Sequence, residues 1–398
     1  MALTKTTNRM KQGAFVNVFD FMTPAQISSV QAGDLAEDVT SAISTAWASF
    51  SAGTMFIPNG TYKTTSKLDF SYVSAGNNIY KGIYSEGAIF KPSGNDITCM
   101  EIGNGTVHRG FYLDGQLNID MDNTTGSGSI GFSNGGQAWR YQINNLLVTN
   151  GSGVGIKLVD GSYGGQWNNI EVTGVGSYGL QLQGASPSSA VTTNQFNSCY
   201  FINCGNSAVK AYSAHNMTFI NLNTASSNSD VGPEVDLESC YSWVLQGGLI
   251  ENGGTSGVGV KTVDVKYPVF LTAVNAQGAG ATEFDPLPSG GLFYSSNRVP
   301  LIPDMFGRSI TLANDAIEDL GERYSKLFIQ STGLGRAAEF YLKNGSSKLI
   351  WEDTTGNFST TAGSSGDVNV YWDAVSSTHK VENKSGSLGT FTLQFRSS

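Results

Sequence analysis

A repeated pattern between Phe132 and Phe284 restricts the possible folds of this chain more than any other feature. In each repeat one apolar residue stands between small or polar residues, as in Gly155-Ile156-Lys157 and Gly179-Leu180-Gln181. The central residues are Phe132, Ile156, Leu180, Val209, Val235, Val260 and Phe284, at successive steps of 24, 24, 29, 26, 25 and 24 residues. Repeats of this length indicate stacked supersecondary units.

A second apolar column supports the same period. Leu146, Ile170 and Cys199 each lie 10 residues before a member of the first column. They belong to segments of strand length that alternate with period two and end in Asn- or Gly-containing turns. Each period therefore holds two or three short strands and no helix, which predicts a coil of a β-solenoid. Such coils stack at about 4.8 Å and bury a continuous core.

Composition agrees with an all-β repeat protein. The 398 residues include 49 glycines, and only 14% of them are charged, which favours turns over surface helices. The 23 basic and 32 acidic residues give a net charge of −9, which argues against a nucleic-acid partner. No apolar run is long enough to span a bilayer, and residues 1–13 contain none, so we expect neither membrane insertion nor a signal peptide.

Cysteine and histidine are too sparse to indicate a metal site. The four cysteines form no pair of CxxC motifs, and there are three histidines. The sequence therefore predicts no metal and no cofactor. We expect Cys199 to be a small apolar member of an inward-facing column.

The N-terminal region divides into an arm and a cap. Residues 1–14 are polar and basic, and we interpret them as an attachment arm. Residues 15–70 hold a predicted edge strand and one amphipathic helix, with Asp34 as its N-cap, Glu37 completing a capping box and Gly53 ending it. A helix in this place would cover the open end of the solenoid core.

The remaining chain divides at the point where the repeat is lost. The register predicts a solenoid over residues 71–299 and ends near Pro300. Residues 300–398 show alternating segments separated by turns, which predicts a small β-sandwich. Trp351 and Trp372 are either core residues of this sandwich or platforms for sugar rings.

The N-terminal region resembles a known superfamily. The run from Val16-Asn17-Val18 through Asp38-Val39-Thr40-Ser41-Ala42-Ile43 to Phe56-Ile57-Pro58-Asn59-Gly60-Thr61-Tyr62 resembles the N-terminal segment of pectate-lyase-like right-handed β-helix proteins. The form Phe19-Asp20-Phe21-Met22-Thr23-Pro24-Ala25-Gln26-Ile27 resembles bacteriophage tailspike and tail-fibre proteins. The resemblance is close over residues 1 to about 70, and beyond them only the repeat architecture is shared.

This resemblance implies a right-handed parallel β-helix in a homotrimeric spike on the virion tail. Residues 1–14 would attach it to a phage tail or baseplate protein. Such spikes recognise, and often cleave, a bacterial surface polysaccharide such as a capsule, an O-antigen or an exopolysaccharide. The superfamily includes hydrolases, lyases and non-catalytic receptor binders, so the resemblance by itself does not select a reaction.

Carboxylates are the candidate catalytic groups. The chain has no phosphate-binding loop that ends in Gly-Lys-Ser or Gly-Lys-Thr. Glycoside hydrolysis needs two carboxyl groups about 5 to 9.5 Å apart. Strand alternation predicts that Glu234, Asp236 and Glu238 share one outward face. The repeat places Glu234 and Glu283 two coils apart, about 9.6 Å, with Gly259 between them.

These acids have a second interpretation. Asp236 belongs to an outward column of largely alternating charge, which is also typical of a purely structural ladder. The members of this column are Lys157, Gln181, Lys210, Asp236, Lys261 and Asp285. Glu171 and Glu251 are further outward-facing acids.

The sequence leaves three functions open. The first is endo-glycosidic hydrolysis of a surface polysaccharide, with catalytic residues Glu234, Glu283, Asp236 and Glu238 and sugar-stacking residues Trp167, Tyr178, Tyr200 and Tyr212. The second is glycan binding without catalysis. The third is β-elimination by a lyase, for which the candidate pairs are Lys210 with His215 and Arg140 with Tyr141.

Overall fold

A computed structural model describes residues 14–397 in two compact units, residues 1–288 and residues 289–398. The gaps in the described chain are residues 73–79, 104–107, 187, 226–232, 253–257, 264–268, 273–274, 279–281, 285–304, 322–324, 332–335, 344, 353–356, 364–367 and 387–388. The predicted arm therefore lies outside the described residues except for Ala14, as does the predicted boundary between residues 299 and 300.

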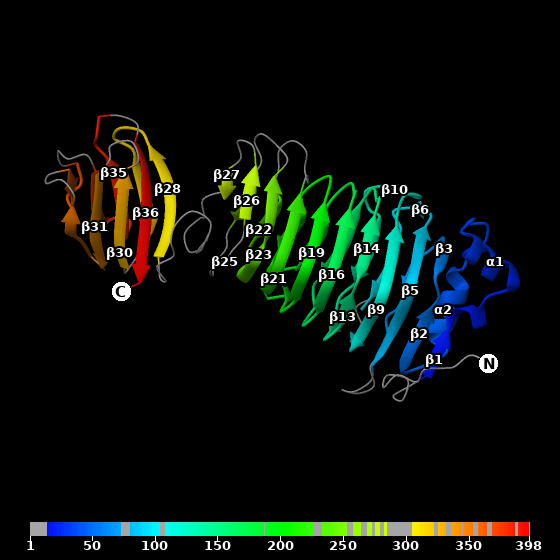
Figure 1. The fold of residues 1–398 in the computed structure, drawn as a ribbon. Coiled ribbons are helices and arrows are strands. Elements are labelled where there is room, and N and C mark those ends of the chain that lie inside the picture. Colours follow the sequence, from blue (N-terminus) through cyan, green and yellow to red (C-terminus); the bar gives the residue numbers. More distant parts are fainter. Residues whose placement is uncertain are drawn as a thin grey trace. The chain divides into compact units, whose positions relative to one another are not determined.

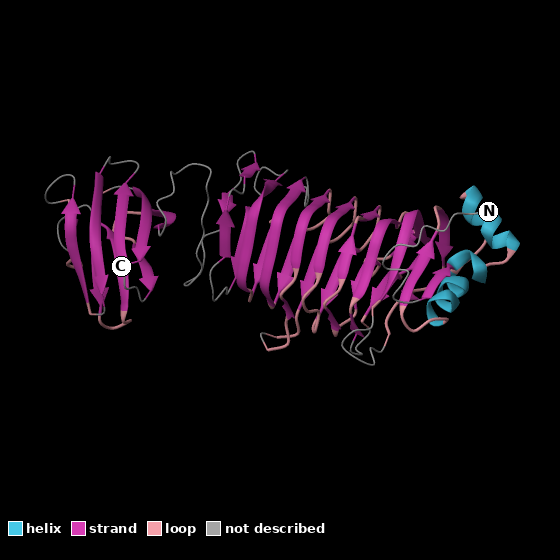
Figure 2. Ribbon diagram, turned by 60° about the horizontal axis from the view of Figure 1, so that its bottom comes forward, coloured by secondary structure: helices cyan, strands magenta, loops and turns pink. Residues whose placement is uncertain are grey.

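Parallel strands of successive coils form two long sheets in the first unit (Figures 1 and 2). The fourteen-stranded sheet contains, in the described chain, β1 (Ala14–Asn17), β2 (Gly53–Ile57), β3 (Gly60–Thr64), β5 (Lys81–Pro92), β9 (Phe111–Asp120), β13 (Gln142–Asn144), β14 (Leu146–Thr149), β16 (Gln166–Thr173), β18 (Val191–Thr192), β19 (Gln195–Ile202), β21 (Ala214–Ala225), β23 (Tyr241–Asn252), β25 (Val269–Thr272) and β26 (Asn275–Gly278). The nine-stranded sheet contains, over the same described residues, β4 (Leu68–Asp69), β7 (Thr98–Ile102), β11 (Ile130–Asn134), β15 (Val154–Val159), β17 (Leu180–Gln183), β20 (Val209–Tyr212), β22 (Val235–Glu238), β24 (Val258–Val263) and β27 (Thr282–Phe284). Two short parallel pairs accompany them, β6 (Gly94–Asn95) with β10 (Thr124–Thr125) and β8 (His108–Arg109) with β12 (Ala138–Trp139).

The strand register confirms the repeat that the sequence predicts. In the nine-stranded sheet the first apolar column is paired residue by residue, from Phe132 with Ile156 to Val260 with Phe284. In the fourteen-stranded sheet Ile170 pairs with Cys199, and Cys199 is buried as expected. The fold is therefore a parallel β-solenoid whose core lies between the two sheets.

Asparagine, serine and glycine form one corner of the coils. The residues at this corner have positive φ angles, which Asn and Gly adopt more readily than other residues, and Ser198 is the exception in composition. They are Asn145 (52°), Asn169 (56°), Ser198 (54°), Asn221 (55°) and Gly247 (67°). The Asn169 side-chain amide donates to Asn145 Oδ1 at 2.8 Å, so neighbouring coils are also linked through their side chains.

In the described residues, the N-terminal cap contains two α-helices and a short 3₁₀ helix, where the sequence predicts one helix. The 3₁₀ helix η1 (Val18–Phe21) precedes α1 (Pro24–Ala32) and α2 (Thr40–Ala48), which lie at one end of the solenoid (Figure 2). The prediction of a helix capped by Asp34 is wrong, because the Asp34 carboxylate accepts hydrogen bonds from Ser29 and Ala36 and closes the loop between the helices. The capping box belongs to α1, where Thr23 and Gln26 bond reciprocally.

Two sheets share one core in the second unit. The larger holds five strands among the described residues, β28 (Met305–Leu312), β36 (Gly389–Ser397), β30 (Ser325–Ser331), β31 (Arg336–Lys343) and β32 (Ser346–Glu352). The smaller holds four described strands, β29 (Ile317–Gly321), β35 (Thr378–Asn383), β34 (Val368–Asp373) and β33 (Phe358–Ser359). Buried side chains of both sheets, among them Phe340 and Val381, form one hydrophobic cluster. Trp351 is 50% exposed and thus not a core residue.

Candidate functional site

Four of the residues predicted for the site lie together on the outer face of the nine-stranded sheet. β20 contributes Lys210 and Tyr212, and β22 contributes Asp236 and Glu238. Lys210 pairs in register with Asp236, and Tyr212 pairs with Glu238. Strand alternation explains their orientation, because the residues between them are fully buried.

Lys210 bridges the two carboxylates of this face. Its Nζ lies 2.7 Å from Asp236 Oδ2 and 3.4 Å from Glu238 Oε2. Burial by itself would lower the pKa of Lys210, but the hydrogen bond to Asp236 and the two negative charges outweigh it, so the pKa is raised. Lys210 is therefore protonated at neutral pH. The two carboxylates that contact it are close enough to each other to act on one glycosidic bond.

Glu234 does not belong to this face, and the prediction that it points outward is wrong. Its side chain is 0% exposed. It occupies a bend just before β22, where strand alternation no longer sets side-chain direction. The residues at the same position of earlier coils are Gly131, Gly155, Gly179 and Ala208. This column faces the core, because a Cβ on Gly155 would lie 2.3 Å from Val172 Cγ1. Glu234 therefore has no access to a polysaccharide.

Glu283 is described only through its backbone. It lies in β27, and the pairing of Val260 with Phe284 places it two coils after Glu234, as the repeat predicts. Its side chain is outside the described part of the structure. The predicted Glu234–Glu283 pair is lost because Glu234 is buried.

The predicted sugar-stacking residues do not form one groove. Trp167 is 0% exposed, and its ring stacks on Phe196 with centroids 5.5 Å apart, so the prediction that it contacts sugar is wrong. Tyr178 is half-buried in the turn before β17. Tyr200 and Tyr212 are exposed, but Tyr200 lies on the fourteen-stranded sheet and Tyr212 on the nine-stranded one.

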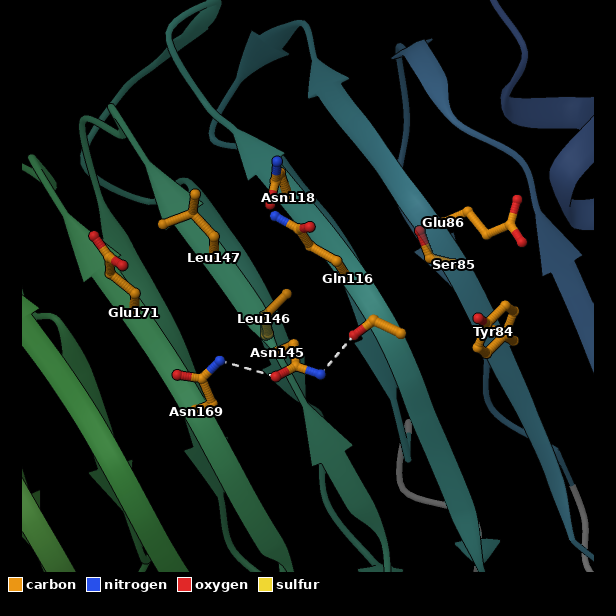
Figure 3. Close-up of a pocket in the computed structure, with 11 residues that line it drawn as sticks. Tyr84, Ser85, Glu86, Gln116, Asn118, Asn145, Leu146, Leu147, Asn169 and Glu171 are labelled. Atoms are coloured by element: carbon orange, nitrogen blue, oxygen red, sulfur yellow. Dashed lines mark hydrogen bonds between the residues drawn. The ribbon is translucent and has the colours of Figure 1, made fainter.

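A groove that the sequence did not indicate lies on the outer face of the fourteen-stranded sheet (Figure 3). It encloses about 560 Å³ over β5, β9, β14 and β16. Its lining residues are Tyr84, Ser85, Glu86, Gly115, Gln116, Asn118, Asn145, Leu146, Leu147, Asn169 and Glu171. We refer to it as the amide groove. Of its two carboxylates, the sequence indicated Glu171 as outward-facing and missed Glu86.

Backbone irregularities shape the amide groove. The pairing of β5 with β9 shifts register between Glu86 and Ala88, and such a bulge re-aims neighbouring side chains. Gly115 has a φ of 83°, and a Cβ there would lie 2.0 Å from the Ser85 carbonyl oxygen, so only glycine fits. Asn145 Nδ2 donates to the Gly115 carbonyl at 2.8 Å and fixes this wall (Figure 3). The sequence signal was the recurrent Asn and Gly, but the predicted register began only at Phe132.

The carboxylates of the amide groove are too far apart to cooperate in hydrolysis. Glu86 pairs with Gln116, and Glu171 pairs with Leu147. Three strand-to-strand steps separate Glu86 from Glu171, which is about 14 Å. The Glu86 side chain also points away from Glu171 (Figure 3). This geometry suits binding rather than paired acid–base chemistry.

Histidine and cysteine do not add to either face. Within the described ranges, no group of three or more His, Cys, Asp or Glu residues could hold a metal ion. The four cysteines are buried. The ring of His215 is nearly buried and stacks on Tyr241 at 4.2 Å, in the sheet that does not carry Lys210.

No protein-family model and no curated protein sequence matches the chain. Among solved structures, the A-module of mannuronan C-5 epimerase AlgE4 from Azotobacter vinelandii is 14% identical, with a TM-score of 0.38 over 71% of this chain and 100% of that one. The tailspike protein of Acinetobacter phage vB_ApiP_P1 is 11% identical, with a TM-score of 0.37 over 96% of this chain and 86% of that one.

The tailspike protein gp49 of Acinetobacter baumannii bacteriophage Fri1, a capsular polysaccharide depolymerase, is 11% identical, with a TM-score of 0.33 over 99% of this chain and 87% of that one. Phage tailspikes are thus among the solved structures that resemble this chain. These likenesses are too distant to assign it a reaction. None of the helices in the described ranges is long and apolar enough to cross a membrane.

Proposed function

We propose that this chain is a bacteriophage tailspike that binds a bacterial surface polysaccharide and cleaves it by endo-glycosidic hydrolysis, with Asp236 and Glu238 as the paired carboxylates. One observation carries this proposal: both carboxylates contact Lys210 Nζ on an outward sheet face beside the exposed ring of Tyr212. The resemblance of residues 1 to about 70 to tailspikes supplies the substrate class.

The geometry suggests separate roles for the two carboxylates. The short contact of Asp236 with Lys210 fixes its position, which suits a nucleophile or a group that stabilises positive charge on the sugar. Glu238 has the longer contact and a side chain that is 42% exposed, which suits proton exchange with the leaving oxygen and water. Tyr212 would stack on a sugar ring next to Glu238.

Hydrolysis fits these residues better than β-elimination does. A lyase needs a base that accepts a proton from a uronate, and the raised pKa of Lys210 makes it a poor base at neutral pH. The nearly buried ring of His215 is packed on Tyr241 in the other sheet, so it cannot serve as the base beside Lys210.

The assembly completes the proposal. We propose that the solenoid is right-handed, that three copies form the spike, and that the second unit is a β-sandwich that holds the trimer together or contacts carbohydrate. Residues 1–14 would attach the spike to a phage tail or baseplate protein. Analytical ultracentrifugation of the full chain tests the trimer, and a monomer at micromolar concentration would contradict it.

The decisive assay is incubation of the purified chain with bacterial capsules, O-antigens and exopolysaccharides, followed by sizing and measurement of new reducing ends. We expect shorter products without new double-bond absorbance. Asp236→Asn and Glu238→Gln should each reduce the rate by about 100-fold or more. Glu283→Gln belongs in the same series, because the sequence predicts Glu283 to be catalytic and its side chain lies outside the described residues.

Asp122→Asn is a matched control. Asp122 also contacts a lysine, Lys91, at 2.9 Å, and its side chain is 43% exposed, but it lies on another part of the solenoid. Its substitution should leave the rate unchanged. Full activity of both Asp236→Asn and Glu238→Gln would remove these residues from the catalytic site, and unchanged chain length of a polysaccharide that the protein binds would remove the hydrolase proposal.

A second candidate function is glycan binding without cleavage. The amide groove favours it, because it is large enough for a ligand and its carboxylates are too far apart for hydrolysis. Tight binding of a polysaccharide with no new reducing ends would support this alternative.

A further inference from the structure

The amide groove is acidic and contains no compensating cation. None of its lining residues, all of which are described, is Lys, Arg or His. Within the described chain, Glu86 and Glu171 form no ion pair and no hydrogen bond. A ligand in this groove therefore meets two exposed negative charges.

The carboxylates of the groove can accept hydrogen bonds from a ligand. An ionised carboxylate can only accept hydrogen bonds. The side chains of Glu86 and Glu171 are exposed, so their carboxylate oxygens are open to donors of a ligand. Sugar hydroxyls are donors of this kind.

The groove also offers an apolar surface. Tyr84 is exposed at one side and stacks on Phe56 with centroids 6.1 Å apart, so one face of its ring remains for a ligand. Leu147 lies at the opposite side, next to Glu171 (Figure 3). Aromatic and aliphatic contacts beside hydrogen-bonding groups are typical of ligand sites, and a volume of about 560 Å³ lies in the usual range.

We propose that the amide groove binds an uncharged segment of the polysaccharide, such as hexose or N-acetylhexosamine residues, and excludes uronates and other anionic sugars. The inference rests on the proposed function, because it assumes a glycan partner. Glu86 and Glu171 accept hydrogen bonds from sugar hydroxyls, whereas a sugar carboxylate is repelled by both. The groove and the Asp236–Glu238 face lie on different sheets, so the groove would hold the chain at a distance from the bond that is cleaved.

Binding is tested in the Asp236→Asn background of the full chain, in which turnover cannot remove the ligand. The neutral probes are maltohexaose, mannohexaose and N-acetylchitohexaose, and the anionic probe of equal length is hexagalacturonate. Binding of each probe at millimolar concentration is measured by saturation-transfer NMR. We expect at least one neutral hexamer to bind and hexagalacturonate not to bind.

Charge variants link this binding to the groove. Glu171→Gln should weaken the binding of a neutral hexamer by roughly tenfold, because a hydrogen bond to a charged group is lost. Glu171→Lys should weaken the binding of that hexamer and allow hexagalacturonate to bind. Glu37→Lys is the matched control, because it makes the same charge change at an exposed site of the N-terminal cap and should alter neither.

Two results would overturn the inference. The first is that the chain with Glu171 intact binds hexagalacturonate at least as strongly as it binds every neutral hexamer. The second is that no neutral hexamer binds in a way that Glu171→Gln weakens. The reducing-end assay on the wild-type chain is independent of both results. Failure of the groove proposal and failure of the hydrolase proposal can therefore be told apart.

Discussion

Substitution of Asn169 should reverse the usual stability order of alanine and glycine. Asn169 has a φ of 56°, and its side chain donates to Asn145 Oδ1 at 2.8 Å. Alanine loses this bond, worth about 1 kcal/mol, and also pays about 1–2 kcal/mol for the left-handed backbone. We expect Asn169→Ala to lower the free energy of unfolding by about 2–3 kcal/mol.

Glycine at the same site separates the two effects. Asn169→Gly loses the same hydrogen bond but accepts the positive φ, and its cost is the extra freedom of the unfolded chain, about 0.5–1 kcal/mol. Asn169→Gly should therefore be more stable than Asn169→Ala by about 0.5–1 kcal/mol. Within regular strands the order is the opposite.

Asn168 is the matched control. It has hydrogen bonds to the neighbouring coils on both sides, at 2.9 Å with Asn144 and at 2.8 Å with Asn197, but its φ is not positive. At this site Ala should be more stable than Gly by about 0.5–1 kcal/mol. The assay is urea unfolding followed by hydrogen exchange of the peptide 166–173, so that the second unit does not contribute. If the Ala variant is more stable than the Gly variant at both sites, the positive φ of Asn169 does not determine the stability of the corner.

Three further predictions concern the core and the cap. Trp167→Ala should lower the free energy of unfolding by about 3–5 kcal/mol in urea titrations, because the ring is fully buried, and a loss below 1 kcal/mol would contradict this packing. Gly155→Ala should cost about 1–3 kcal/mol, because its Cβ would meet Val172 Cγ1 at 2.3 Å, and Val172→Ala should recover part of the loss in the double variant. Burial lowers the pKa of Lys81 from 10.5 to about 8. The unfolded chain then binds the extra proton between pH 8 and pH 10.5, so stability should rise with pH across this window. Lys81→Met should flatten the rise in urea titrations at pH 8, 9 and 10, and an equal slope in both proteins would show that Lys81 is not its source.

Local sequence patterns predicted the elements that depend on a regular backbone. The 24-residue period specified the stacked coils, and the register of Phe132 with Ile156 followed from it. The position of the helices in the N-terminal cap was harder to predict. The Asp34 pattern matched an N-cap, but this carboxylate instead closes the loop between the helices. The signal for α1 was present in Thr23 and Gln26 and was not used.

In the candidate site, prediction likewise succeeded within a regular strand and failed outside it. Alternation along β22 correctly placed Asp236 and Glu238 on the outside, because successive residues of an extended strand point to opposite faces. The rule failed one residue before the strand, at Glu234. In the bend that this residue occupies, direction depends on how the corner packs against the coil interior.

The sequence by itself determined the period, the parallel stacking and the outward face that carries Asp236, Glu238 and Tyr212. These follow from the backbone periodicity of single strands and their repetition along the chain. Only the tertiary structure decided that Glu234 and Trp167 are buried, and that the amide groove lies beside the bulge at Glu86. These outcomes depend on which side chains from other coils occupy the space at each corner, and no local pattern contains that information.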